Sequence, residues 1–389
     1  MIVLDETVLD QIIKSFAGVG SRAITRHEAR FLMKIGFCLV LAGYKVNTGG
    51  ANGSDTAFEF GAKTAYDFLA KRLNLPPGEY ANVMRCFLPW AGFSGRPNSS
   101  GYLLRNDDIV ERASEITAPF HPYWLKLPPR AKLLMSRNAN QVLGEDLNTP
   151  VHFVLGLTSD AAYTARQTSQ KTGGTGQAIR IGDHYGVEVF NLNHPPHRQR
   201  IEDWVDNIAN EAITTYGFDP RELVDEALDN HVGFTTRQYG DIVAMASRGE
   251  AEIVVQGLSC QCTNGAGLAE QLFKAFPEAK AADHATKKGD AKKLGTYTLA
   301  QCTRNGKPVL IINAYTQRYW GRDPEVLYAD YEAIRKVFEQ IARDFPGRQL
   351  TIPRIGAGFA NGCWVSIANT IRHACRRLPE PILIDYQAA

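Results

Sequence analysis

Short apolar runs that end in glycine-rich loops recur along the chain. Residues 253–255 form such a run, and a loop of small residues separates it from apolar positions at helical spacing in residues 268–276. The run predicts a buried strand, and the spacing predicts a helix that stops at Pro277. A second unit of this kind starts at residue 350 and leads into a helix predicted over residues 365–376. A glycine loop at a helix N-terminus presents backbone N–H groups and the positive end of the helix dipole, which favours phosphate.

The same pattern occurs twice near the start of the chain. One apolar strand ends in GVGSR at residues 18–22, and a strand over residues 44–47 runs into TGGANGSD at residues 48–55. Helices are predicted over residues 25–42 and from Ser54 onward. Further strands are predicted at residues 83–89, 151–158 and 187–192. Alternating strands and helices predict a parallel sheet covered by helices, with ligands bound at the carboxyl ends of the strands.

Length and composition narrow the class of protein. The chain has 389 residues, more than a single ordinary core accommodates, so two domains are expected. No apolar run approaches the roughly 20 residues of a membrane helix, and the acidic N-terminus is not a secretory signal, so a cytoplasmic protein is expected. Cys260 and Cys262 form a CxC without a second pair at ligand spacing, which predicts no metal site. A net charge of +2 argues against an extended nucleic-acid surface.

Residues 237–386 resemble macrodomains, the fold that binds ADP-ribose, and in particular those of bacteria and phages. The motifs that carry the resemblance are GDI at 240–242, QCTNGAGLAEQ at 261–271, KKGDAKKLGTY at 287–297, IINAYTQ at 311–317 and PRIGAGF at 353–359. The resemblance implies a three-layer α/β/α domain.

That resemblance also implies a set of ADP-ribose contacts. Asp241 would accept a hydrogen bond from the adenine amino group, the alternative being an ordinary turn or helix N-cap. Tyr386 would stack on the adenine, the alternative being an ordinary aromatic residue at a strand end. Backbone N–H groups of the two loops would hold the diphosphate. The other contacts implied are Ile242, Asn264, Gly265, Ala266, Gly267, Gly356, Ala357, Gly358 and Phe359.

Residues 10–195 resemble the SLOG superfamily, which includes the Rossmann-like domain of DNA-processing protein A and the LOG nucleotide phosphoribohydrolases. The motifs are GVGSR at 18–22, NTGGANGSDTAFEFGA at 47–62, MSRNANQVLGED at 135–146 and KTGGTGQAI at 171–179. The resemblance implies nucleotide binding at the glycine loops. The contacts that it implies are Gly20, Ser21, Arg22, Gly49, Gly50, Asp55, Glu59, Arg137, Gly173, Gly174 and Thr175.

Two of these positions carry alternatives. Arg137 suits a phosphate partner, but a surface salt bridge is an equally ordinary use of arginine. LOG enzymes carry a glutamate within GGxGTxxE, and residues 173–180 have no carboxylate at the matching place. Asp55 or Glu59 could supply an acid from the other loop, although no spacing indicates it. Binding by this domain is therefore expected rather than N-glycosidic cleavage.

The sequence leaves catalysis by the second domain open. One group of macrodomains uses a lysine on the central strand, and residues 311–315 contain none. Cys363 stands where close relatives often have aspartate. The remaining catalytic candidates are Asp290 and His284 as general bases and Ser259 on the first loop. The alternatives are hydrolysis of an ADP-ribose phosphate or adduct, a non-catalytic sensor or sponge, and single-stranded DNA handling, against which the near-neutral charge counts.

We therefore predict an α/β protein with two domains. A Rossmann-like parallel sheet of the SLOG type is expected over residues 1–205, a helical linker over 206–235 and a macrodomain over 236–389. The expected partner is ADP-ribose, a related NAD-derived nucleotide or an ADP-ribosylated target, with no required cofactor and no membrane. The resemblance also allows a homo-oligomer through the SLOG-like domain. A role in NAD-linked conflict between phages and bacteria follows by analogy from the pairing of the two folds.

Overall fold

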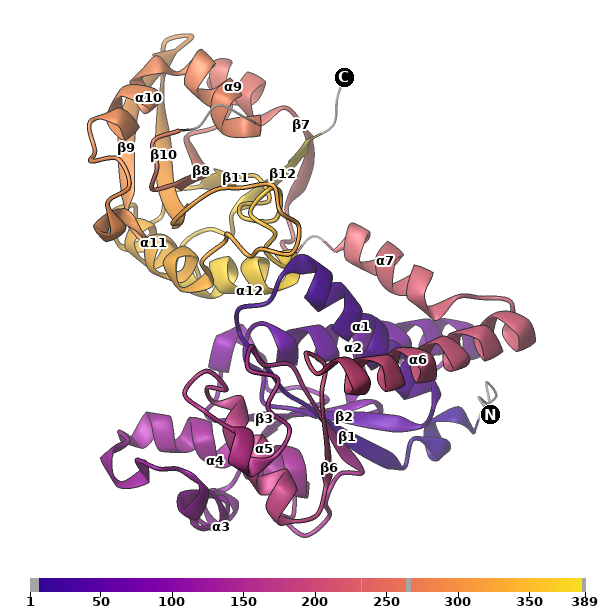
Figure 1. Cartoon of the computed structure of the whole chain (residues 1–389). Helices are drawn as coiled ribbons and strands as arrows, with labels where there is room; N and C mark the ends of the chain where they lie inside the picture. Colours follow the sequence, from indigo (N-terminus) through magenta and orange to yellow (C-terminus); the bar gives the residue numbers. More distant parts are fainter. Residues whose placement is uncertain (1–6, 232, 264–266, 387–389) are drawn as a thin grey trace. The chain divides into compact units, whose positions relative to one another are not determined.

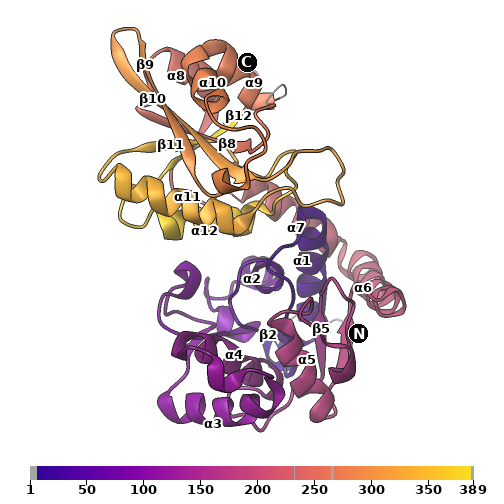
Figure 2. The ribbon, with the colours of Figure 1, turned by 60° about the vertical axis from the view of Figure 1, so that its left-hand side comes forward.

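The structure, a computed structural model, describes residues 7–231, 233–263 and 267–386. It divides into two compact units. The first comprises Met1–Arg22 and Glu28–Asn230, and the second comprises Ala23–His27 and His231–Ala389. Each unit contains one six-stranded sheet (Figures 1 and 2). The predicted α/β class with two separate sheets is confirmed.

The sheet of the first unit is entirely parallel, as predicted, with strand order β4-β3-β2-β1-β5-β6. Its strands are β1 (Lys14–Gly18), β2 (Tyr44–Thr48), β3 (Met84–Leu88), β4 (Tyr102–Leu104), β5 (Phe153–Gly156) and β6 (Glu188–Asn191). The helices are α1 (Arg26–Leu41), α2 (Ser54–Leu73), α3 (Asp107–Thr117), α4 (Pro129–Leu143), α5 (Thr175–His184), α6 (Pro195–Tyr216) and α7 (Pro220–Asn230). Residues 206–230, predicted as part of a linker, belong to this unit.

Helices cover both faces of this sheet because its strands are apolar on both sides. Phe16 of β1 contacts Phe58 of α2 edge to face, with ring centroids 5.8 Å apart. Its neighbour Ala17 points to the opposite face and belongs to a buried cluster with residues of α3, α4 and α5. Successive side chains of one strand point to opposite faces of the sheet, so the strand packs against two helical layers. The edge strand β4 was missed in the sequence because three residues show no usable periodicity.

The sheet of the second unit is mixed, with strand order β7-β12-β11-β8-β10-β9. Strand β9 pairs antiparallel with β10, and the other pairs are parallel. The strands are β7 (Arg237–Gly240), β8 (Ile253–Ser259), β9 (Tyr297–Arg304), β10 (Lys307–Gln317), β11 (Leu350–Ile352) and β12 (Ile382–Tyr386). The helices are α8 (Ile242–Ser247), α9 (Gly267–Ala275), α10 (Pro277–His284), α11 (Tyr331–Asp344) and α12 (Trp364–Ala374), with a short 3₁₀ turn, η7, at Ala291–Lys293.

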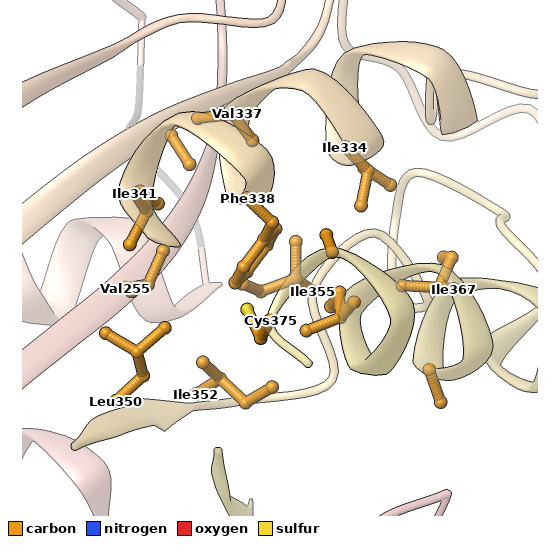
Figure 3. Close-up of a cluster of buried hydrophobic side chains, with 14 of the residues drawn as sticks. Val255, Ile334, Val337, Phe338, Ile341, Leu350, Ile352, Ile355, Ile367 and Cys375 are labelled. Atoms are coloured by element: carbon orange, nitrogen blue, oxygen red, sulfur yellow. The ribbon is translucent and has the colours of Figure 1, made fainter. Parts of the chain in front are cut away.

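Two apolar clusters sandwich this sheet. On one face, Ile253 and Val255 of β8 pack with side chains of α11 and α12, among them Phe338, which is fully buried (Figure 3). On the other face, Val254 packs with residues of α8, α9 and α10. The result is a three-layer arrangement consistent with the predicted macrodomain fold.

Close packing of α1 against α2 yields the first testable prediction. A Cβ added to Gly61 of α2 would overlap the carbonyl oxygen of Met33 in α1. Alanine at a helix interior normally stabilises by about 1 kcal/mol relative to glycine. Here overpacking outweighs that gain, so we expect Gly61→Ala to lower the free energy of unfolding by about 1–3 kcal/mol in urea denaturation. The exposed Lys71→Ala on the same helix is the control, and a stabilised Gly61→Ala protein would contradict the packing.

Candidate functional site

A pocket of about 420 Å³ lies at the carboxyl ends of β1, β2 and β5 in the first unit. Three loops and three helices, α2, α4 and α5, supply its walls, the arrangement expected for a ligand site on a parallel sheet. The lining residues are Val19, Gly20, Ser21, Arg22, Ala51, Asp55, Leu134, Met135, Arg137, Asn138, Gln141, Thr158, Ser159, Lys171, Thr172, Gly173, Gly174 and Thr175.

The structure brings most of the SLOG-like residues of the sequence analysis together here, and it places three of them outside the lining. Gly49 lies behind the pocket, where its carbonyl accepts a hydrogen bond from Arg137 and its N–H donates to Asp55. Gly50 packs against Arg96. The third, Glu59, forms a buried ion pair with Arg96, with Nε and Oε2 3.0 Å apart. That pair gives Glu59 a structural use away from the pocket.

Arg137 is the buried cation of the pocket, with 6% of its surface exposed. Burial lowers the pKa of Arg137 to about 10, while the nearby Asp55 charge acts to raise it, so the guanidinium stays charged near neutral pH. Among the described residues, its Nε has no hydrogen-bond acceptor. An unpaired buried donor is costly unless a ligand satisfies it. Its surroundings therefore argue against the surface salt bridge that was the alternative use of this arginine.

Asp55 is the acidic member of the lining. Its Oδ2 accepts hydrogen bonds from the backbone N–H groups of Gly49 and Ala51, both at 3.1 Å. Burial raises the pKa of Asp55, and the charge of Arg137 opposes that rise. Arg22 and Lys171 are exposed at the pocket and add positive charge. Three cations against one carboxylate, beside the N-terminus of α5, suit an anionic ligand.

Sequence reasoning missed several lining residues, of which Gln141 is the most informative. It follows Arg137 by four residues on α4, so the two side chains share a helix face. Gln141 is 1% exposed, and within the described chain its Oε1 receives no hydrogen bond. The i, i+4 spacing was a signal in the sequence that could have identified it once Arg137 had been chosen.

In the second unit, the two residues predicted to contact adenine lie at neighbouring strand ends. Tyr386 of β12 is in register with Gly240 of β7, the residue before Asp241. The Oδ1 of Asp241 accepts hydrogen bonds from the N–H groups of Val243 at 2.8 Å and Ala244 at 3.2 Å, so it caps α8. The capping role given as an alternative for Asp241 is therefore present. Ile242 is buried beneath it.

The two glycine loops of this unit follow β8 and β11, which are hydrogen-bonded neighbours in the sheet. Asn264, Gly265 and Ala266 of the first loop lie outside the described residues. Gly267 begins α9 with a φ of +65°, and a Cβ there would meet the ring of Phe359 from the second loop at 3.5 Å. Phe359 is 61% exposed. Gly267, at the end of the first loop, therefore lies close to the second loop, where Ala357 and Gly358 also lie.

Gly356 explains the shape of the second loop. Its φ is +73°, and an added Cβ would crowd Ile367 at 3.2 Å and Ile334 at 3.4 Å. Both the backbone angle and the packing therefore require glycine.

An ion-pair cluster that sequence analysis missed fixes the start of this loop. Arg354 donates from Nε to Oδ1 of Asp385 at 2.7 Å and from Nη2 to Oδ2 at 2.9 Å. Arg237 of β7 approaches the same Oδ2 at 2.6 Å. Burial opposes ionisation of Asp385, but the hydrogen bonds and charges of the two arginines outweigh it and hold the pKa of Asp385 below its ordinary value. The three residues join the second loop to β12 and β7.

The three catalytic candidates are not assembled into one centre by any hydrogen bond in the described part of the chain. Ser259 is buried at the end of β8 and accepts a hydrogen bond from the N–H of Gln261 at 3.3 Å. Asp290 caps η7 by accepting from the N–H of Lys292 at 2.9 Å. His284 is exposed at the end of α10. Each has a local structural environment that requires no substrate.

Two further features are absent from the described residues. No group of three or more His, Cys, Asp or Glu side chains in that part of the chain is placed to hold a metal ion. Likewise, none of the helices described is long and apolar enough to cross a membrane.

Comparison with known proteins gives one sequence relative and several structural neighbours. No protein-family model matches the chain. An uncharacterized 17.5 kDa protein from the tk-vs intergenic region of Enterobacteria phage T4 is 32% identical over 154 residues, which are 38% of this chain and 94% of that protein.

Two solved structures described as macrodomains align with the chain at low similarity. The macrodomain of Mycobacterium tuberculosis DarG is 19% identical, covering 40% of this chain and 97% of that one, with a TM-score of 0.32. A macrodomain protein from Streptomyces coelicolor is 20% identical, covering 39% and 99%, with a TM-score of 0.30. At these scores the neighbours carry no argument about ligand or activity.

The ion-pair cluster predicts an acid-sensitive loop. A carboxylate whose pKa is lower in the folded state than in the unfolded state stabilises the fold at pH values above its unfolded-state pKa, about 3.9 for aspartate. This stabilisation is lost as the pH falls through the folded-state pKa. We expect Asp385→Asn to reduce hydrogen-exchange protection in peptides from β11 and β12 at pH 7, and the deficit to shrink below about pH 4. Glu325→Gln, which removes an exposed carboxylate of the same unit, is the control. A deficit that is independent of pH would contradict the role of the charge.

Proposed function

We propose, from the geometry of its own site, that the second unit binds ADP-ribose. Over 38% of its length, the chain belongs to the family of the uncharacterized 17.5 kDa protein of Enterobacteria phage T4. The observation that carries this proposal is the placement of two glycine loops on adjacent parallel strands, β8 and β11. Adjacent loops of this kind can offer backbone N–H groups to both phosphates of one diphosphate. The motif resemblance supplies the identity of the nucleotide.

The adenine end of the proposed site lies one strand further along the sheet. Asp241 directly follows β7, and Tyr386 is the last residue of β12. Strand β12 is the neighbour of β11 in the sheet. An adenosine bound there would have its diphosphate directed toward the glycine loops. The Arg354–Asp385 pair supports this geometry because it anchors the second loop to β12. A preorganised loop loses less conformational entropy when a ligand binds.

We also propose that the pocket of the first unit binds a phosphate-bearing nucleotide. Support comes from the buried Arg137 with its unpaired Nε, the unpaired Oε1 of Gln141 and the N-terminus of the ten-residue helix α5. A charged donor, a neutral acceptor and a helix N-terminus together suit a ligand that combines phosphate with a hydroxyl or amino group. The SLOG resemblance again supplies the ligand class.

Binding without turnover is the form of this function that we propose. Ser259 and Asp290 are both engaged in local hydrogen bonds, and no hydrogen bond joins either of them to His284 within the described residues. A hydrolase needs a base within hydrogen-bond reach of its attacking water. The chain would then act as a reader or a sink for ADP-ribose-type nucleotides.

Calorimetric titration of ADP-ribose into the full chain tests both sites at once. We expect two equivalents bound by the wild type, because each unit carries a site. Asp241→Ala is expected to weaken the second-unit site about tenfold, equivalent to about 1.4 kcal/mol for a lost hydrogen bond. Arg137→Met is expected to remove the first-unit site, since it deletes the buried charge with little change of volume. Arg130→Met, at an exposed position on the same helix, is the matched control.

Controls separate ligand contacts from folding effects. Asp241→Ser keeps an N-cap acceptor for α8 but removes the carboxylate that would reach adenine. If Asp241→Ser binds like the wild type while Asp241→Ala does not, the aspartate acts only as a cap. If the wild type binds a single equivalent and Asp241→Ala loses it, ADP-ribose would be excluded as a ligand of the first unit but not of the second. No binding heat from the wild type would refute ADP-ribose as the ligand of either unit.

Turnover has a separate test. Incubation of the full chain with ADP-ribose 1″-phosphate is expected to release no phosphate above the rate of the protein-free reaction. Phosphate release that disappears in Ser259→Ala or Asp290→Asn would overturn the binding-only form and identify a catalytic residue. Release that persists in both variants would show contamination or a different centre, and Asp241→Ala distinguishes the two.

A further inference from the structure

A buried polar cluster of the second unit pairs the thiol of Cys262 with a lysine. The Nζ of Lys293 donates a hydrogen bond to Cys262 Sγ at 3.0 Å. Lys293 is 7% exposed. The same Nζ lies 3.6 Å from Oδ1 of the fully buried Asp283 and 4.3 Å from the ring centroid of Tyr315. Tyr315 in turn donates its hydroxyl to Asp283 at 2.8 Å. Neither the proposed ADP-ribose contacts nor the catalytic candidates include this arrangement.

Cys262 differs from the other cysteines in being reachable. Six of the seven cysteines of the chain are buried, whereas Cys262 is of intermediate exposure. Its backbone has a φ of +51°, a conformation that few non-glycine residues adopt. The loop therefore holds an accessible sulfur against a buried amine, and Thr286 Oγ1 lies 3.5 Å from the same sulfur.

A lysine in contact with a thiol can capture the product of thiol oxidation. Peroxides oxidise the cysteine sulfur to a sulfenic acid. The sulfenic acid that results is electrophilic at sulfur and condenses with a nearby nitrogen to a sulfenamide. Here the nitrogen is already in contact with the sulfur, so capture requires only a small approach of Nζ.

We propose that Cys262 and Lys293 are an oxidative modification site, at which hydrogen peroxide converts the contact into a reversible sulfenamide cross-link. In the first step the sulfur attacks a peroxide oxygen: the S–O bond forms, the O–O bond breaks and water leaves. Sulfur is oxidised by two electrons and the peroxide is reduced.

In the second step Lys293 gives a proton to Asp283, and its Nζ then attacks the sulfur. The S–N bond forms, the S–O bond breaks and the hydroxide leaves as water with the second ammonium proton. The proton on Asp283 passes to solvent. The protein has then lost two hydrogen atoms, one peroxide has become two waters, and the charge of Lys293 is gone. The cross-link joins the loop after β8 to η7.

Non-reducing peptide mass spectrometry of the peroxide-treated full chain tests the proposal. We expect a linked pair of peptides that contain Cys262 and Lys293, lighter by two hydrogens than their sum and separated again by dithiothreitol. Cys262→Ser and Lys293→Arg are expected to abolish it. The buried Cys260→Ser and the adjacent, exposed Lys292→Arg are matched controls that should retain the link.

A trapping experiment keeps the test independent of folding losses. Dimedone reacts with sulfenic acids, so Lys293→Arg, which keeps the charge but lacks the nucleophilic amine, is expected to be labelled at Cys262 several-fold more than the wild type. Equal labelling of both proteins, or a wild type that gives only sulfinic acid or an intermolecular disulfide at Cys262, would overturn the proposal. The readouts do not involve ADP-ribose, so they stand or fall separately from the proposed function.

Discussion

The structure of each unit depends on the loop that follows a buried parallel strand. The strand's last residues are paired in the sheet, but the next N–H groups have no ladder partner and must be satisfied elsewhere. In the first unit Asp55 accepts two of them, from Gly49 and Ala51. The turn is thereby closed without the help of a ligand. A loop fixed in this way presents its remaining groups in a constant geometry, which is what a binding site requires.

In the second unit, ion pairs between side chains fix the position of the loop. Asp385 near the end of β12 accepts the fork of Arg354 and also the charge of Arg237. A buried carboxylate alone would be expensive, and two arginines with matched hydrogen bonds offset that cost. The consequence is positional: the second glycine loop cannot move independently of the strands that carry Asp241 and Tyr386.

Sequence alone predicted the architecture well because its signals are local. Apolar runs, glycine loops and helix starts lie within a few residues of each other, so the parallel sheet of the first unit and the three-layer arrangement of the second followed from pattern and resemblance. The interactions that tune each site are not local. Glu59 and Arg96 are far apart in sequence, and so are Arg354 and Asp385. No spacing rule links such residues, and only the folded chain shows that Glu59 is occupied by Arg96 rather than directed at a ligand.

The buried cations illustrate why burial alone does not reveal function. Arg96 donates to Glu59 and Thr56 through its Nε and Nη2, although its Nη1 has no partner in the described structure. Arg137 is equally buried, yet its Nε lacks an acceptor in the described structure and it lines a pocket. Lys293 is buried as well, but it donates a hydrogen bond to the sulfur of Cys262. Three cations at similar depth therefore differ in what surrounds them: Arg96 pairs with a carboxylate, Arg137 lines a pocket and Lys293 contacts a thiol.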